Sequence, residues 1–220
     1  MTTPDLQMPG VPRIAARISQ HFRGQRWAHF LQRFPDLPDM AVIDLGGYYW
    51  NWVSAPVTPK SLVVVNLDGR RFDDEPDWVE TVTADACELP TSLFERNFDL
   101  VCSNSLLEHV GGYSRRQRVA QAVHQLAPHH WIQTPARSFP LEPHFLFPCF
   151  QFLPVQLRAR LSRAWPFSPG HNQWTSWRDH LDSVLGIELV SATEMQYLFP
   201  GSELHRERVA GITKSLTMAR

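Results

Sequence analysis

The chain has 220 residues, a mass of 25.3 kDa and a formal net charge of −1 at pH 7, which suits one domain with a substantial core. The near-neutral balance provides no basic field that would recruit nucleic acid. No stretch approaches the roughly 20 apolar residues of a membrane-spanning helix, and the polar start of the chain lacks the pattern of a secretory signal. We therefore expect a cytoplasmic protein with no integral membrane segment and no nucleic-acid partner.

The first part of the chain predicts alternating helices and strands. Apolar residues at helical spacing over 11–35 predict one or two amphipathic helices. The apolar runs that predict buried strands cover 41–45, 61–67, 79–84, 98–103 and 131–133. A helix over 114–127, with apolar residues on one face and arginines on the other, precedes the last of these strands. Such alternation is typical of a parallel sheet with right-handed crossovers.

The second part of the chain has a different character. The segment over 134–177 is rich in Pro, Phe and Trp, contains a short basic helix over 155–163, and is long enough to predict a functional lid or binding insertion. The last runs, 204–209 and 212–218, predict an antiparallel strand pair. We therefore predict one α/β domain over 1–220, with a seven-stranded, mostly parallel, doubly wound sheet and an aromatic and Pro-rich insertion after its fifth strand.

Glycines and polar residues stand at the ends of four predicted strands. These motifs are Asp44-Leu45-Gly46-Gly47, Asn66-Leu67-Asp68, Asp85-Ala86 and Ser103-Asn104-Ser105. Because the carboxyl ends of parallel strands meet at one edge of a sheet, they predict a ligand crevice. Their order and spacing resemble the class I, Rossmann-like S-adenosylmethionine-dependent methyltransferases. Further similarity, in Glu108-His109-Val110 and in Glu142-Pro143-His144-Phe145, is to a type-11-like bacterial subgroup often linked to polysaccharide or glycolipid biosynthesis.

The resemblance implies a set of residues that would hold S-adenosylmethionine. They are Asp44, Gly46, Gly47, Asn66, Asp68, Asp85, Ala86, Ser103 and Asn104. The glycine turn would wrap the amino-acid half of the cofactor, where a Cβ would keep the backbone away. Asn66, in the better register, or Asp68 would bond the ribose hydroxyls. Asp85 would accept from the adenine amino group, with the following amides near a ring nitrogen.

The acceptor side is predicted from two further groups of residues. In the first, Glu108 and His109 would lie close to the transferred methyl group, and a neutral histidine is a suitable base for an alcohol attacking in line. The alternative is that both residues only pack and pair under their loop. In the second, Arg137, Glu142 and His144 would contact the substrate, with His144 a second candidate base; packing explains the neighbouring aromatic residues equally well.

Three functions remain open on the sequence. The first is O-methylation of a sugar, glycan or glycolipid hydroxyl, which the resemblance favours. The second is methylation of an apolar lipid or quinone-type acceptor, which the Phe-rich insertion would suit. The third is binding of cofactor or partner without catalysis. A nicotinamide dehydrogenase is disfavoured because its glycine fingerprint is missing. We expect no metal, since the three cysteines are scattered and no carboxylate cluster has the spacing of octahedral ligands.

Overall fold

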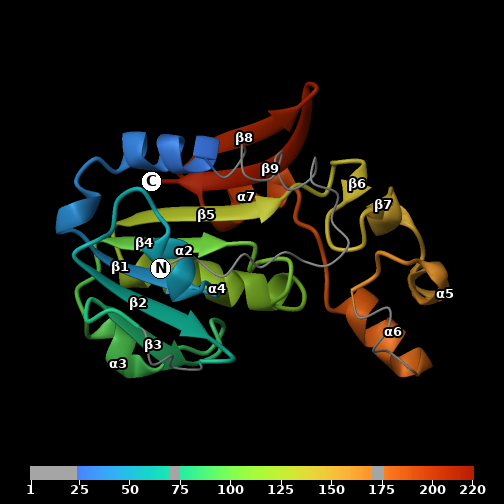
Figure 1. Ribbon diagram of the computed structural model, residues 1–220, viewed down its shortest axis with the longest axis horizontal. Helices are drawn as coiled ribbons and strands as arrows, with labels where there is room; N and C mark the ends of the chain where they lie inside the picture. Colours follow the sequence, from blue (N-terminus) through green and yellow to red (C-terminus); the bar gives the residue numbers. More distant parts are fainter. Residues whose placement is uncertain (1–23, 70–74, 170–175) are drawn as a thin grey trace.

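The computed structural model describes residues 24–69, 75–169 and 176–220, and a seven-stranded sheet forms its centre (Figure 1). The strands are β1 (Ala41–Leu45), β2 (Ser61–Asn66), β3 (Val79–Thr83), β4 (Leu100–Asn104), β5 (His129–Pro135), β8 (Glu203–Val209) and β9 (Ile212–Ala219). Their order in the sheet is β3-β2-β1-β4-β5-β9-β8. The first five are parallel, whereas β9 runs antiparallel to both β5 and β8. The predicted fold class is confirmed.

Both faces of the sheet are buried, which explains the uninterrupted apolar runs in its strands. Outside the insertion, the labelled helices are η1 (Leu37–Asp39), α2 (Tyr49–Val53), α3 (Thr91–Phe94), α4 (Tyr113–Leu126) and α7 (Ala192–Leu198). A helix over 24–33, η1 and α2 bury Phe30 and Trp52 against the face that carries Val42. Residues of α3, α4 and α7 pack on the opposite face, which carries Ile43 and Leu45. Alternate residues of β1 thus supply two separate cores.

The segment after β5 forms a small unit with its own core. It contains β6 (Leu141–Glu142), β7 (Phe147–Pro148), η2 (Phe150–Phe152), α5 (Val155–Ala164) and α6 (Trp177–Leu185). Phe145 and Phe150 are buried against Ala159 of α5 and Val184 of α6. In Figure 1 this unit lies beyond the carboxyl ends of β4 and β5. It is therefore beside the edge of the sheet where the predicted crevice lies.

The predicted elements differ from the observed ones mainly at their ends. Strand β5 begins at His129 and runs to Pro135, so it is longer than predicted and takes in the first two residues of the predicted insertion. The expected basic helix is α5, and the closing strand pair is β8 and β9. One expectation for α4 is wrong, since Arg116 is buried. Residues 11–23 of the predicted N-terminal helices lie outside the described residues.

Within the described ranges, no helix is both long and apolar enough to cross a membrane.

Candidate active site

The carboxyl ends of the parallel strands bring the predicted site motifs to one edge of the sheet. Leu45 pairs with Val65, Asn66 pairs with Thr83, and Asn104 pairs with Gln133, so these strands end at nearly the same level. The loops that follow them carry the glycine turn, the acidic strand ends and the Glu-His pair. Ligands of open α/β sheets bind at this edge.

The turn after β1 is built around a buried carboxylate. Asp44 is 2% exposed, and its Oδ2 accepts a 2.8 Å hydrogen bond from Trp52 Nε1, while its Oδ1 has no hydrogen-bond partner among the described residues. Burial raises the pKa of Asp44 to about 6, although the Trp52 bond acts in the opposite direction. A buried oxygen without a partner is costly, so this atom is available to a ligand that donates a hydrogen bond.

The two glycines of this turn are required by close contacts. A Cβ on Gly47 would lie 1.9 Å from Asp44 Oδ2, which is far shorter than a van der Waals contact between carbon and oxygen. Gly46 has φ +79°, and a Cβ there would lie 2.7 Å from Leu106 Cδ1. A side chain at either position would displace its neighbours, because the carboxylate and Leu106 already occupy that space. The close packing of this turn therefore requires glycine at both positions.

Asn66 braces this turn from the end of β2. Its Nδ2 donates to the carbonyl oxygens of Gly46 (3.4 Å) and Gly47 (3.1 Å), and its Oδ1 accepts from the Asp68 amide (3.4 Å). The side-chain amide thus supports the glycine backbone, a role that the sequence did not indicate. Its long, weak contact with the Asp68 amide still leaves Oδ1 able to accept from a ligand. Asp68 is exposed.

Asp85 follows β3 and is paired across the crevice edge with α4. Its Oδ1 accepts from the Cys87 amide at 2.8 Å, and its Oδ2 accepts from the Arg115 guanidinium. Partial burial raises the pKa of Asp85, but the Cys87 and Arg115 bonds outweigh that effect and hold it below its usual value. The Cys87 amide is therefore engaged within the protein, and Ala86 beside it is buried.

At the end of β4, one polar residue is buried and the two that follow it are exposed. Ser103 is fully buried, and its hydroxyl donates to the Leu45 carbonyl oxygen at 2.9 Å, so it ties β4 to β1. Asn104 is exposed at the strand end. Ser105 has a positive φ of 55°, an unusual backbone for a residue with a side chain. This kink turns the chain into the loop that carries Glu108 and His109.

The two predicted acceptor-side groups meet in a chain of three side chains. His144 Nδ1 lies 2.7 Å from Glu142 Oε1, and His144 Nε2 lies 3.1 Å from His109 Nε2. Glu142 is 2% exposed, and its other oxygen accepts from the amides of His144 and Phe145 at 2.8 and 2.7 Å. A carboxylate held in this way fixes the orientation of the histidine ring. His109 is exposed, but desolvation by the surrounding protein, and then the neighbouring His144, lower the pKa of His109, which favours its neutral form.

Glu108 lies next to this chain and is 1% exposed. Thr134 at the end of β5 donates its hydroxyl to Glu108 Oε2 at 2.9 Å, whereas Oε1 has no hydrogen-bond partner among the described residues. Burial raises the pKa of Glu108, and its own amide and the Thr134 hydroxyl oppose that shift. One ligand atom from each of Glu108, His109 and His144 lies within 4.8 Å of the others.

Arg137 lies apart from this group. Its side chain is exposed, while its amide donates to the Val190 carbonyl oxygen and its carbonyl oxygen accepts from Gln151. Glu142, which was predicted to contact the substrate as Arg137 was, is bonded to His144. The aromatic residues of the insertion also divide: Phe145 and Phe150 form its core, whereas Phe152, Phe167 and Trp177 are exposed.

Three residues that support the site were not predicted as part of it. Trp52 holds Asp44, Arg115 holds Asp85, and Thr134 holds Glu108. Arg115 donates across 30 positions of sequence and Thr134 across 26, so no local pattern links them to their partners. Trp52 lies 8 residues after Asp44, and an indole N–H close behind a strand-end carboxylate was the one available signal.

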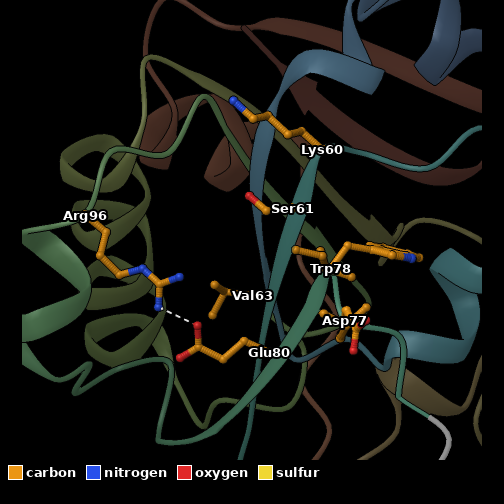
Figure 2. Close-up of a pocket in the computed structure, with 9 residues that line it drawn as sticks. Lys60, Ser61, Val63, Asp77, Trp78, Glu80 and Arg96 are labelled. Atoms are coloured by element: carbon orange, nitrogen blue, oxygen red, sulfur yellow. Dashed lines mark hydrogen bonds and ion pairs between the residues drawn. The ribbon is translucent and has the colours of Figure 1, made fainter.

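A separate pocket of about 490 Å³ lies at the opposite ends of the strands, where β2 and β3 begin (Figure 2). Its lining includes Lys60, Ser61, Trp78, Glu80 and Arg96, and Arg96 bonds Glu80 at 2.9 Å across it. None of the predicted site residues lines this pocket. The crevice at the carboxyl ends therefore remains the candidate active site.

No protein-family model matches the chain, and neither does any curated protein. Solved structures do resemble it. Magnesium protoporphyrin IX methyltransferase from Synechocystis, with bound S-adenosylhomocysteine, superposes with a TM-score of 0.54 at 12% identity, covering 96% of this chain and 88% of that one. The N-terminal domain of EvdMO1, also with S-adenosylhomocysteine bound, superposes with a TM-score of 0.52 at 15% identity. The match covers 90% of this chain and 79% of that one. A Rhodobacter sphaeroides structure whose name proposes a zinc-dependent alcohol dehydrogenase superposes with a TM-score of 0.55 at 10% identity. The match covers 89% of this chain and 87% of that one.

The strand order distinguishes between these likenesses. A dinucleotide-binding dehydrogenase sheet continues with a parallel sixth strand, in the order 3-2-1-4-5-6. Here the strand beside β5 is the antiparallel β9, with β8 outside it. The chain has the class I methyltransferase fold. At these identities the likeness establishes the fold alone.

The residues at the crevice fit the cofactor that this fold implies. S-adenosylmethionine carries a primary ammonium and a carboxylate at one end, and the glycine turn lies beside a buried Asp44 oxygen that has no partner among the described residues and can accept from an ammonium. The Asn66 Oδ1 and the Asp85 carboxylate add acceptors along the same edge of the sheet. Of the predicted set, Ser103 is the residue whose side chain is already used within the sheet.

Proposed function

We propose that this protein is an S-adenosylmethionine-dependent O-methyltransferase that acts on a hydroxyl of a sugar, glycan or glycolipid headgroup. The observation that carries the proposal is the turn after β1, where a buried Asp44 oxygen lacks a hydrogen-bond partner among the described residues. Such an unsatisfied group is expected where a ligand completes the hydrogen bonding. It lies in the crevice at which this fold binds its ligand.

When bound, S-adenosylmethionine supplies the methyl group and leaves as S-adenosylhomocysteine. Asp44 accepts from the ammonium of its amino-acid half, and Gly46 and Gly47 let the backbone approach it. Asn66, with Asp68 exposed nearby, accepts from the ribose hydroxyls. Asp85 faces the adenine, beside Ala86, and Asn104 lies on the sulfonium side.

On the acceptor side, the cluster of Glu108, His109 and His144 binds the hydroxyl and removes its proton. An alcohol is a weak nucleophile while protonated, and a proton acceptor held in place typically contributes about 10²–10⁴-fold to the rate. Glu142 orients His144 toward this point, because its carboxylate bonds Nδ1 at 2.7 Å. Arg137, exposed at the start of the insertion, would contact a more distant polar part of the acceptor.

A glycolipid headgroup is favoured over a free sugar by the surface of the insertion. Phe152, Phe167 and Trp177 are exposed by 55%, 49% and 44% on the insertion, which also carries His144. Aromatic side chains of this kind contact an apolar chain or stack on a sugar ring. A wholly apolar acceptor suits the charged Glu108 and Glu142 less well.

The test is transfer of a labelled methyl group from S-adenosylmethionine into glycan and glycolipid fractions. We expect label in a base-stable methyl ether, and an Asp85→Ala variant should need a cofactor concentration higher by roughly tenfold or more, because it loses a charged hydrogen-bond acceptor. Asp182→Ala, which removes an exposed carboxylate on α6, is the matched control and should behave as wild type. Label in neither fraction, with cofactor bound, would contradict the O-methylation proposal.

A further inference from the structure

The side chains of Glu108, His109 and His144 have the chemistry of a metal site. One carboxylate and two imidazoles, contributed by the loop after β4 and by the insertion, bring their ligand atoms within 4.8 Å of one another. Imidazole nitrogen with carboxylate oxygen is a donor set that first-row divalent transition metals prefer. His144 lies 35 positions after His109 in the chain, so the fold assembles the set.

The separation of the two histidine nitrogens agrees with two ligands of one ion. Zinc and its neighbours bind imidazole at about 2.0–2.1 Å, so two nitrogens at right angles around one ion lie about 3.0 Å apart. The observed Nε2–Nε2 distance is 3.1 Å. The ring planes are 89° apart and the ring centroids only 4.8 Å apart, so the rings approach side-on rather than head to head. The two nitrogens therefore lie close enough together to be bound by one ion.

Glu108 supplies an independent reason to expect a ligand there. It is 1% exposed and its Oε1 has no hydrogen-bond partner among the described residues, although burying a charged oxygen without a partner is costly. A cation satisfies this oxygen directly. The three ligand atoms lie up to 4.8 Å apart, whereas adjacent ligands of a bound ion lie about 3 Å apart. We therefore expect the Glu108 side chain to rotate slightly toward the histidines when an ion binds.

The residues behind these ligands hold them as the supports of a metal site do. Glu142 bonds His144 Nδ1 at 2.7 Å, which leaves Nε2 for an ion, and Glu142 is itself held by two backbone amides. Thr134 holds the second oxygen of Glu108 at 2.9 Å. A ligating histidine almost always donates its other nitrogen to a carboxylate or carbonyl group in this way.

A second histidine pair provides a contrast. His124 and His130 also approach edge to face, with centroids 5.5 Å apart. Their Nε2 atoms, however, are bonded to the Leu198 carbonyl oxygen and to the Ser202 hydroxyl. The Nε2 atoms of this pair are therefore satisfied by the protein and do not face each other as those of His109 and His144 do.

We propose that Glu108, His109 and His144 bind one divalent transition-metal ion, with Glu142 as the positioning residue for His144. Three protein ligands leave coordination positions open for the acceptor. With the ion bound, His109 and His144 are its ligands and no longer act as the base. The acceptor hydroxyl then binds the ion and loses its proton to solvent. The resulting alkoxide forms the new O–CH₃ bond as the S–CH₃ bond breaks, and S-adenosylhomocysteine leaves with the electron pair. This catalytic consequence rests on the proposed function, whereas ion binding does not.

The test is binding of Co²⁺ to the metal-free full-length protein, followed by calorimetry and by the visible absorption of the bound ion. We expect about one equivalent bound by wild type and no specific binding by His109→Gln or Glu108→Gln. Glu142→Gln should bind about 10–100-fold more weakly, as losses of such supporting residues do. His124→Gln, in the satisfied pair, should match wild type.

Binding of S-adenosylhomocysteine by the same variants separates the two proposals and reports their folding. Retained cofactor binding with lost Co²⁺ binding supports the site. Equal Co²⁺ binding by wild type and both ligand variants overturns it. Co²⁺ binding without cofactor binding by wild type leaves the metal site standing and contradicts the proposed function.

Discussion

Asp44 is the residue at which folding and function oppose each other most clearly. Its carboxylate is buried with one oxygen unpartnered, and burial raises its pKa from 3.8 to about 6. The folded state therefore binds a proton more tightly than the unfolded state. The stabilisation from that proton is complete below about pH 3.8 and is lost as the pH rises through about 6. Near pH 8 the native protein holds an ionised carboxylate at a cost on the order of 3 kcal/mol.

Replacing Asp44 by Asn should stabilise the ligand-free protein at pH 8. The Asn oxygen can still accept from Trp52 and carries no charge, so we expect a gain on the order of 1–3 kcal/mol. The gain should shrink as the pH is lowered from about 6 toward 4, since wild type then becomes neutral as well. Urea unfolding of both proteins at pH 8 and pH 5 measures this. A gain that is the same at both values would contradict the raised pKa.

At the scale of elements, a buried ion-pair cluster fastens α4 to the chain around α7. The Arg116 side chain is 3% exposed and bonds Glu194 at 2.6 Å and Glu188 at 3.0 Å. Removing it leaves two carboxylates facing each other, one of them half exposed, so we expect Arg116→Ala to cost about 2–4 kcal/mol. Arg118 pairs with Glu88 on the surface, where both side chains are more than half exposed.

Arg118→Ala is the matched control for that change. A surface ion pair contributes about 0–1 kcal/mol, so its unfolding midpoint in urea should stay close to that of wild type. Near-equal losses of stability in the two alanine variants would show that the Arg116 ion pairs stabilise the protein no more than the surface pair of Arg118 does.

The same elements show how far the sequence could be used. Val42 to Leu45 and Leu62 to Val65 are buried on both faces, so their apolar runs predicted β1 and β2 directly. The start of β5 was missed because His130 is polar, although Ser202 satisfies it within the core. Helices α6 and α7 were missed despite local signals: Ser176 and Ser191 cap them through the amides of Asp179 and Glu194.

The candidate site was predictable where local chemistry dictates it and not where distant residues do. Gly46 and Gly47 form a strand-end turn that has no space for a side chain, and such a turn is recognisable from its glycines. His109 and His144 stand in short polar motifs. The pairing of those histidines depends on how the insertion folds back on the loop after β4. Arg116 looked like a surface arginine because its partners lie 72 and 78 positions away.

On the scale of the whole molecule, the insertion has a core of its own beside the two cores of the sheet. Units of this kind open separately from the rest of a protein. Phe145→Ala should remove about 3–5 kcal/mol from the insertion core. We expect faster amide hydrogen exchange in α5 and α6, with β1, β4 and α4 unchanged. Leu157→Ala, at an α5 position exposed by 42%, should change neither the stability of the insertion core nor the hydrogen exchange of α5 and α6.

Equal acceleration of exchange across the sheet in Phe145→Ala would mean that the insertion and sheet unfold as one unit. Separate opening would instead allow the insertion to move while His144, which it carries, approaches or leaves His109.

The central claim is that the turn after β1 binds the cofactor of this fold, and calorimetry with S-adenosylhomocysteine tests it most directly. We expect wild type to bind with a dissociation constant on the order of micromolar. Gly47→Ala should bind at least roughly tenfold more weakly, because its Cβ displaces the Asp44 carboxylate. Gly24→Ala is the control and should bind as wild type, because a Cβ there would meet no heavy atom of the described residues within 4 Å apart from its chain neighbours. Absence of binding to folded wild type, or equal binding by Gly47→Ala, would contradict the account.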